Sequence, residues 1–336
     1  MQTIREWHNV DQATFVSEIL PTHQPAILRG LLSEWPVVRA GLQSAAQLVD
    51  YLKQLDTGGT VKAYVGPPEI DGRFFYTDDY RGFNFDARDV SISVALDTLV
   101  SMVDDDTPPA IALQAIDMPA VMPSFMADNP MHLLDGQVAP RVWINNRTMI
   151  AAHFDVDHNI ACVVGGKRHF TLFPPEQAAN LYVGPLLNTP GGPPISTVNL
   201  RQPDYDRFPR FAEALESAQE AILEPGDAIY IPILWWHGVD SMTSLNVLVN
   251  YWWNNAASAQ HDPMLSLVHC MAIMSGMPES QRDGWRALFD CFVFQQAGRP
   301  GEHLPAELRD VMGELSASDR DMLIAHLTRK MAEQLT

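Results

Sequence analysis

The sequence predicts a mainly β fold, an antiparallel sandwich or barrel, with α/β elements before it and a helical appendage after it. From residue 109 onward, short apolar or alternating segments follow one another between Pro, Gly and Asn residues. Before that point helical and strand patterns mix, and from about residue 261 only helical patterns remain. We therefore predict one domain over residues 1–260, with an α/β part at 1–108 and a β core at 109–260, and a helical region over 261–336.

In the α/β part, patterns that predict strands alternate with patterns that predict helices. PAILRG, TVKAYVGPP and GRFFYTDD predict short strands. GLQSAAQLVDYLKQL has apolar residues at helical spacing and ends before TGG, and VSISVALDTLVSMV predicts a second helix.

The β core has five clear strand candidates. They are RVWINN, NIACVVGG, RHFTLFPP, DAIYIP and LNVLVNYWW. Residues 177–222 contain too many prolines for continuous strands, so we expect a loop with one helix, FPRFAEALESAQEAI. After the core, SLVHCMAIM, RALFDCFVF and DRDMLIAHLTRKMAEQL predict helices.

The charge of the chain disfavours two classes of partner. A net charge of -19 repels nucleic acid and anionic membranes, and the chain has no basic run. The opening residues MQTIREWHNV lack a signal pattern, and no apolar run reaches the roughly 18 residues that span a bilayer. We expect a soluble, cytoplasmic protein with no membrane partner, for which nucleic acid is a disfavoured partner.

The motif HFDVDH, residues 153–158, and a histidine after ILWW predict a metal site. On a strand His153 and Asp155 would point the same way, and His237, at the end of an apolar segment, is the best third ligand. Two histidines and one carboxylate form the facial triad of Fe(II) oxygenases. Taken alone, His237 would be better explained as a core histidine. Asp157 shares the parity of the motif and could assist, whereas His158 points the other way and suits a loop histidine.

Several motifs together resemble a known family. The H-x-D motif, NIACVVGGKRHFTLFPPEQ, PDYDRFPRF, LEPGDAIYIPILWWHGV and NVLVNYWW closely resemble, in order and spacing, the cupin-like JmjC-related oxygenases, the group that includes the asparaginyl hydroxylase factor inhibiting HIF. The resemblance covers about residues 140–255. It implies a double-stranded β-helix (cupin or jelly-roll fold) and Fe(II)- and 2-oxoglutarate-dependent catalysis in the 1–260 domain. His153, Asp155 and His237 match the three metal-binding, catalytic residues of the group.

The resemblance also implies residues that bind the co-substrate. Arg168 matches the basic residue, a lysine in the group, that binds the distal carboxylate of 2-oxoglutarate, and a guanidinium can grip a carboxylate with two hydrogen bonds. Lys167 is the alternative, although it faces the other way on a regular strand. Asn159 and Asn250 match asparagines near the co-substrate.

The chain departs from the group at two co-substrate positions and in the substrate region. Ala112 and Ile150 stand where the asparaginyl hydroxylase has a tyrosine and a threonine, and Thr148 or Asn145 are candidate replacements. Its peptide-binding residues fall where this chain reads GGPPIST, so its substrate is not transferred. Trp252 matches an aromatic of the active site and is our candidate for substrate binding, although tryptophan pairs in a barrel more often serve packing.

The resemblance implies that the protein hydroxylates a C–H bond with O2 and 2-oxoglutarate, giving succinate and CO2. A protein or peptide side chain is the substrate that we predict first. One alternative is the same chemistry on a small molecule. Another is a non-catalytic, metal-binding cupin regulatory protein, which the changes at Ala112 and Ile150 motivate. A zinc hydrolase of the H-x-H-x-D-H type is disfavoured, because Asp155 stands in place of its second histidine. The resemblance further implies a homodimer through the C-terminal helices.

Overall fold

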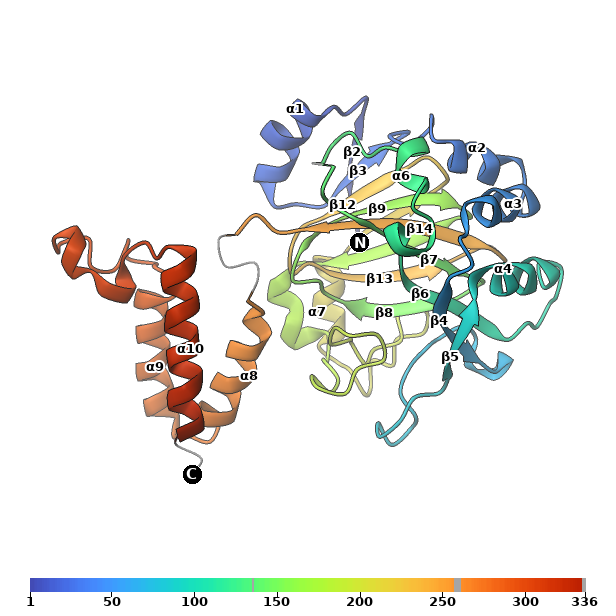
Figure 1. Cartoon of the computed structure of the whole chain (residues 1–336). Helices are drawn as coiled ribbons and strands as arrows, with labels where there is room; N and C mark the ends of the chain where they lie inside the picture. Colours follow the sequence, from blue (N-terminus) through green and yellow to red (C-terminus); the bar gives the residue numbers. More distant parts are fainter. Residues whose placement is uncertain (135, 257–260, 334–336) are drawn as a thin grey trace. The chain divides into compact units, whose positions relative to one another are not determined.

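The computed structural model describes residues 1–134, 136–256 and 261–333. The chain divides into two compact units, Met1–Asn254 and Asn255–Thr336 (Figure 1). The first unit contains every β-strand that the structure describes and the second contains only helices and turns. The predicted mainly β fold, with helices in the N- and C-terminal regions, is confirmed.

Two mixed sheets form the centre of the first unit. The five-stranded sheet has the order β1-β11-β10-β13-β8 and the nine-stranded sheet the order β2-β3-β12-β9-β14-β7-β6-β4-β5. The strands are β1 (Gln2–Thr3), β2 (Arg5–His8), β3 (Ala26–Arg29), β4 (Thr60–Gly66), β5 (Asp86–Ser91), β6 (Ala110–Asp117), β7 (Pro140–Asn145), β8 (Met149–His153), β9 (His158–Gly165), β10 (Arg168–Phe173), β11 (Gln219–Leu223), β12 (Ala228–Ile231), β13 (Trp236–Ser241) and β14 (Asn246–Trp253).

The chain changes sheet at almost every step from β7 to β14. The strands β7, β9, β12 and β14 lie in the large sheet, whereas β8, β10, β11 and β13 lie in the small one. Neighbouring strands of this set pair antiparallel within each sheet. Such alternation is that of a double-stranded β-helix, and it places two facing sheets around one interior.

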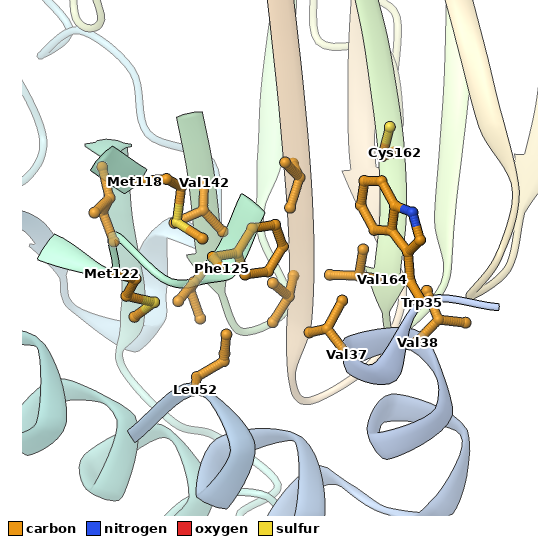
Figure 2. Packing of buried hydrophobic residues seen from close by; sticks show 14 of the residues in the cluster. Trp35, Val37, Val38, Leu52, Met118, Met122, Phe125, Val142, Cys162 and Val164 are labelled. Atoms are coloured by element: carbon orange, nitrogen blue, oxygen red, sulfur yellow. The ribbon is translucent and has the colours of Figure 1, made fainter. Parts of the chain in front are cut away.

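Helices cover one face of the large sheet. Trp35, Val37 and Val38 lie at the start of one helix, Leu52 on the next, and Phe125 on a short third one, and all pack on strands β7 and β9 (Figure 2). The helices of this unit are α1 (Gln12–Thr14), α2 (Pro36–Gln43), α3 (Ala45–Leu55), α4 (Ile92–Ser101), α5 (Met118–Val121), α6 (Phe125–Asp128) and α7 (Phe211–Glu216). This apolar layer closes the outer face of the large sheet and leaves its inner face for the interior between the sheets.

Three sequence predictions of secondary structure were wrong in detail. GRFFYTDD is not a strand. It forms a loop with buried Phe75 and Tyr76, and its isolated bridges are one from Arg73 to Met149 of β8 and one from Tyr76 to Phe83 within the loop. The helix predicted at 208–222 ends at Glu216, and the following residues form β11, since pairing with β10 outweighs their helical preference. The helix predicted from residue 41 is two helices, and Ser44 caps the second by accepting a hydrogen bond from the Gln47 N–H.

The second unit contains three longer helices, α8 (Pro263–Met274), α9 (Glu279–Phe292) and α10 (Ala317–Glu333), as the helical patterns predict. None of the residues in these helices is buried. Among the helices that the structure describes in either unit, none has both the length and the apolar character that crossing a bilayer needs.

Candidate metal centre

The three predicted ligands come together at the edge of the small sheet. His153 is the last residue of β8 and lies directly opposite His237 of β13, and their ring centroids are 4.2 Å apart. Asp155 lies in the turn after β8, with Oδ2 3.6 Å from the His237 Nε2. The donor atoms of all three residues lie within 4.8 Å of one another. Two ligands that are each about 2.1 Å from one ion lie at most about 4.2 Å apart, so a small inward movement would let all three bind one ion.

Backbone hydrogen bonds orient both imidazole rings. The Nδ1 atom of His153 lies 3.0 Å from the carbonyl oxygen of Ala151, and that of His237 lies 3.0 Å from the carbonyl oxygen of Trp235. A carbonyl oxygen only accepts, so each Nδ1 must carry the proton and donate it. The lone pair of each ring is therefore on Nε2. This is the arrangement by which proteins fix histidine ligands of metals.

Burial keeps His237 uncharged. Burial first, and the neighbouring His153 second, lower the pKa of His237 to about 4, while Asp155 acts in the opposite direction. A metal ligand must be a neutral imidazole, so the site is prepared for a cation without first losing a proton at neutral pH. The donor set therefore fits a divalent metal ion, with two neutral nitrogens and one carboxylate.

The strand β8 has a β-bulge next to this pair of histidines. Between the pairs His237–His153 and Val239–Ile150, two residues of β8, Ala151 and Ala152, lie opposite the single residue Gly238. A Cβ atom at Gly238 would collide with the side chain of Leu200. A larger residue at position 238 therefore requires the Leu200 side chain to move.

The triad opens into a cavity of about 280 Å³ between the two sheets. All seven residues predicted for the site line this cavity: His153, Asp155, Asn159, Arg168, His237, Asn250 and Trp252. Ala112 and Ile150, the two residues that differ from the co-substrate-binding residues of the asparaginyl hydroxylase, line it as well. So do their candidate replacements, Asn145 and Thr148. The structure thus brings together every residue that the sequence assigned to the site.

Arg168 is a buried cation in the wall of this cavity. Its side chain is 3% exposed, its guanidinium donates one hydrogen bond of 2.7 Å from Nη2 to Asn145 Oδ1, and its Nε has no partner. No ion pair of Arg168 occurs among the described residues. Burial lowers the pKa of Arg168 to about 9, so the group is still a cation at neutral pH. An isolated buried cation is costly, and an anion entering the cavity would offset this cost.

Lys167 has a different environment. Its Nζ lies 2.9 Å from Glu224 Oε1 and the side chain is about 40% exposed. The turn between β9 and β10 contains Gly166 with a φ of +76°, a conformation that favours glycine. This turn directs Lys167 outward and starts β10 with Arg168 facing the interior.

The other two polar residues of the motif are outside the cavity lining. His158 Nδ1 lies 3.0 Å from the hydroxyl of Tyr230, which donates to it, and the Ile233 N–H also points to this nitrogen. Burial, followed by the charge of His23, lowers the pKa of His158. Asp157 does not belong to the metal-ligand cluster formed by the described residues.

Sequence reasoning missed several residues of the cavity wall. Tyr64, Gln114 and Trp143 line it. Pro190, Gly191 and Pro193 of the Pro-rich insertion line it as well, in the region that the sequence associated with the substrate. Tyr64 belongs to β4, directly opposite Ala112 of β6. One sequence does not show which strands pair. The alternation in TVKAYVG indicated only that Tyr64 and its nearest neighbours in the chain point to opposite faces of the sheet.

Comparison with known proteins identifies the family. The family of cupin-like domains matches residues 12–259. The chain is 27% identical over 270 residues to mouse tRNA wybutosine-synthesizing protein 5, covering 75% of this chain and 78% of that protein. It is 37% identical over 114 residues to the Arabidopsis thaliana lysine-specific demethylase JMJ31, covering 34% of this chain and 20% of that protein.

A third relative is the zebrafish lysine-specific demethylase 8, 25% identical over 248 residues, which are 71% of this chain and 55% of that protein. The chain thus spans less than two thirds of the two demethylases. JmjC cupin-like proteins are typically Fe(II)- and 2-oxoglutarate-dependent oxygenases, and the His-Asp-His cluster is compatible with iron. With its alternating two-sheet core and a match over most of its length, the chain belongs to the JmjC-related family of cupin-like domains.

Proposed function

We propose that this protein is an Fe(II)- and 2-oxoglutarate-dependent oxygenase that hydroxylates a C–H bond of its substrate. The observation that carries the proposal is the pairing of two features in one cavity. A cluster of two histidines and one carboxylate lies on its wall, and a buried arginine without a carboxylate partner among the described residues lies there too. The first suits Fe(II), and the second suits a dicarboxylate that reaches from the metal to the guanidinium.

The polar groups around Arg168 support its role as the carboxylate-binding residue. Asn145 holds the guanidinium through its Oδ1, and its Nδ2 lies 2.6 Å from Thr148 Oγ1. Thr148 therefore accepts from Asn145 and keeps its own hydroxyl proton to donate. Of the two replacements considered from the sequence, Asn145 acts on Arg168, whereas Thr148 has a donor left for a ligand.

Tyr64 supplies a further donor that the sequence did not suggest. Tyr64, Ala112 and Asn145 lie directly opposite one another on three adjacent strands, so their side chains share one face. The small Ala112 lies between Tyr64 and Asn145, and Tyr64 and Arg168 line the same cavity. Burial raises the pKa of Tyr64, which keeps its hydroxyl protonated and able to donate. We assign to Tyr64 the hydrogen bond that Ala112 cannot make.

The remaining residues position the reactants and exclude water. When bound, Fe(II) with 2-oxoglutarate and O2 supplies the oxidising chemistry, and succinate and CO2 are the co-products. His153, Asp155 and His237 would hold the metal through one face, as in facial-triad sites. Trp143 and Trp252 meet edge to face at a centroid distance of 6.1 Å and form an apolar wall for the substrate.

A protein or peptide side chain is the proposed substrate. The names of the relatives point to lysine residues and to a tRNA base, and the net charge of -19 disfavours the polyanion. A small molecule is the alternative. Asparaginyl hydroxylation is not proposed, since the Pro-rich insertion that lines the cavity differs from the sequence of that enzyme.

Anaerobic titration calorimetry tests the co-substrate assignment. The protein is loaded with Fe(II), or with Mn(II) as a redox-stable substitute, and 2-oxoglutarate is titrated into it. Binding that requires both the metal and Arg168 supports the oxygenase, and oxygenated peptides are then sought by a mass increase of one oxygen atom. Metal binding without any binding of 2-oxoglutarate would instead favour the non-catalytic, metal-binding cupin protein.

The homodimer through the C-terminal helices and the cytoplasmic location stay predictions. The second unit exposes large apolar side chains, which in monomers are usually scattered singly. They include Leu265, Trp285, Leu288, Phe292, Phe294 and Leu327. Sedimentation velocity of wild type and of Phe292→Asp tests the dimer, and a single monomeric species for wild type over a wide concentration range would contradict it.

A further inference from the structure

The carboxylate of Asp155 receives two hydrogen bonds from opposite residues on neighbouring strands. Trp252 Nε1 donates to Oδ2 over 2.9 Å and Asn159 Nδ2 donates to the same oxygen over 3.2 Å. Trp252 of β14 and Asn159 of β9 face each other in the register of the large sheet. Asp155 itself lies in a turn, where no backbone ladder orients its side chain. The large sheet therefore holds a carboxylate whose two histidine partners belong to the small sheet.

The hydrogen bonds continue to a fourth residue. Asn250 Nδ2 donates to Asn159 Oδ1 over 2.8 Å. Because strand side chains alternate, Asn250 lies on the same face of β14 as Trp252. The chain of bonds runs from Asn250 through Asn159 to Asp155, and Trp252 joins it at its end.

The carboxylate determines the direction of this chain. An ionised Asp155 only accepts, so Asn159 must present its amide N–H to it and turn its oxygen toward Asn250. Asn250 must then present its own N–H, which leaves its Oδ1 with no partner and buried in the cavity wall. Both amide orientations follow from the charge of Asp155.

From these contacts we infer that Trp252 is a positioning residue for the metal centre. Its indole N–H, together with Asn159 backed by Asn250, holds the Asp155 carboxylate in one orientation. Its ring remains free to form the substrate wall. This inference rests on the proposed function, in that Asp155 is a metal ligand, but it concerns metal affinity and not the reaction.

Hydrogen bonds of this kind typically change metal affinity by about 10- to 100-fold. Trp252→Phe keeps an aromatic wall and removes the N–H, so we expect the dissociation constant for Mn(II) to rise at least about 10-fold. At saturating Mn(II), the affinity for 2-oxoglutarate should stay within about threefold of wild type. A residue that only packs would not produce this split between the two ligands.

Trp143→Phe is the matched control. Trp143 lines the same cavity and touches Trp252, but no hydrogen bond joins it to Asp155. Asn159→Leu removes the other donor and should weaken Mn(II) binding as well, which keeps the test available if one variant folds poorly. Thermal unfolding of the metal-free proteins shows whether each variant is folded.

The outcomes separate this inference from the proposed function. Equal Mn(II) affinity of wild type, Trp252→Phe and Trp143→Phe would overturn the positioning role while leaving the oxygenase intact. Equal loss in Trp252→Phe and Trp143→Phe would also overturn it, since ring packing would then be the cause. If wild type does not bind Mn(II) through His153 and Asp155, the proposed function itself fails.

Discussion

Replacing Arg168 by methionine should separate ligand binding from stability. In the ligand-free protein the guanidinium is buried and has no carboxylate partner among the described residues, so its removal relieves a desolvation cost. The loss of its hydrogen bond leaves Asn145 Oδ1 with one partner fewer, at a cost of about 1–3 kcal/mol. These terms oppose each other, and we expect the free energy of unfolding to fall by no more than about 1 kcal/mol, or to rise.

The effect on 2-oxoglutarate should be much larger. Removing one partner of a buried charge pair costs about 3–5 kcal/mol, because the other charge stays buried and unpaired. That range is roughly a 150- to 4,000-fold increase in the dissociation constant. Calorimetry with the Mn(II)-loaded protein measures it, and urea unfolding of the metal-free protein measures stability.

Lys167→Met is the control for Arg168→Met. It removes a neighbouring cation that is paired with Glu224 outside the cavity, so the affinity for 2-oxoglutarate should not change. If Arg168→Met binds 2-oxoglutarate as wild type does, Arg168 is not the carboxylate-binding residue. If the variant loses several kcal/mol of stability, Arg168 is a structural residue.

Three further predictions concern stability. Burial lowers the pKa of His237 to about 4, below the value of about 6.5 in the unfolded chain. The unfolded state therefore binds a proton first as the pH falls below 6.5, and the free energy of unfolding of the metal-free protein should fall by up to about 3 kcal/mol toward pH 4. Urea unfolding at pH 7 and at pH 5 measures this fall, which should be smaller in His237→Gln. Phe125→Ala empties a fully buried position next to Trp35 (Figure 2) and should cost about 3–5 kcal/mol in the same assay, whereas Leu187→Ala, at an exposed site, should change stability by less than about 0.5 kcal/mol. Ala115 has a φ of +44° at the bulge of β6, so Ala115→Val should lower the thermal midpoint and Ala115→Gly should leave it equal or higher, and the opposite order would contradict backbone strain there.

The sequence predicted the β core well because its strands repeat a simple pattern. NIACVVGG, DAIYIP and LNVLVNYWW are apolar on both faces and become β9, β12 and β14, which lie between helices on one side and the second sheet on the other. GRFFYTDD has a similar composition but forms a loop, because its aromatic side chains pack against Ala151 and Ile195 in place of a neighbouring strand. Composition indicates burial, and it does not indicate which backbone partner is present.

The candidate site was predictable where its residues are close in sequence or belong to a motif. His153 and Asp155 follow from one short motif, and Arg168 follows from the resemblance to the oxygenase group. Tyr64 could not be found in this way, because its relation to Ala112 exists only through the pairing of β4 and β6. The sequence prediction for Trp252 was incomplete for the same reason. Its indole N–H donates to the carboxylate of Asp155, which lies 97 positions away in the chain.

The polar atoms without partners show where the fold keeps room for ligands. Among the described residues, three buried side-chain atoms lack a hydrogen bond, and two of them, Arg168 Nε and Asn250 Oδ1, belong to the cavity wall. They have opposite requirements, because the guanidinium needs an acceptor and the amide oxygen needs a donor. A dicarboxylate can satisfy Arg168, but its oxygens would be repelled by Asn250 Oδ1. That oxygen therefore needs an N–H or O–H donor, from water or from a bound ligand, whereas Arg168 needs an acceptor.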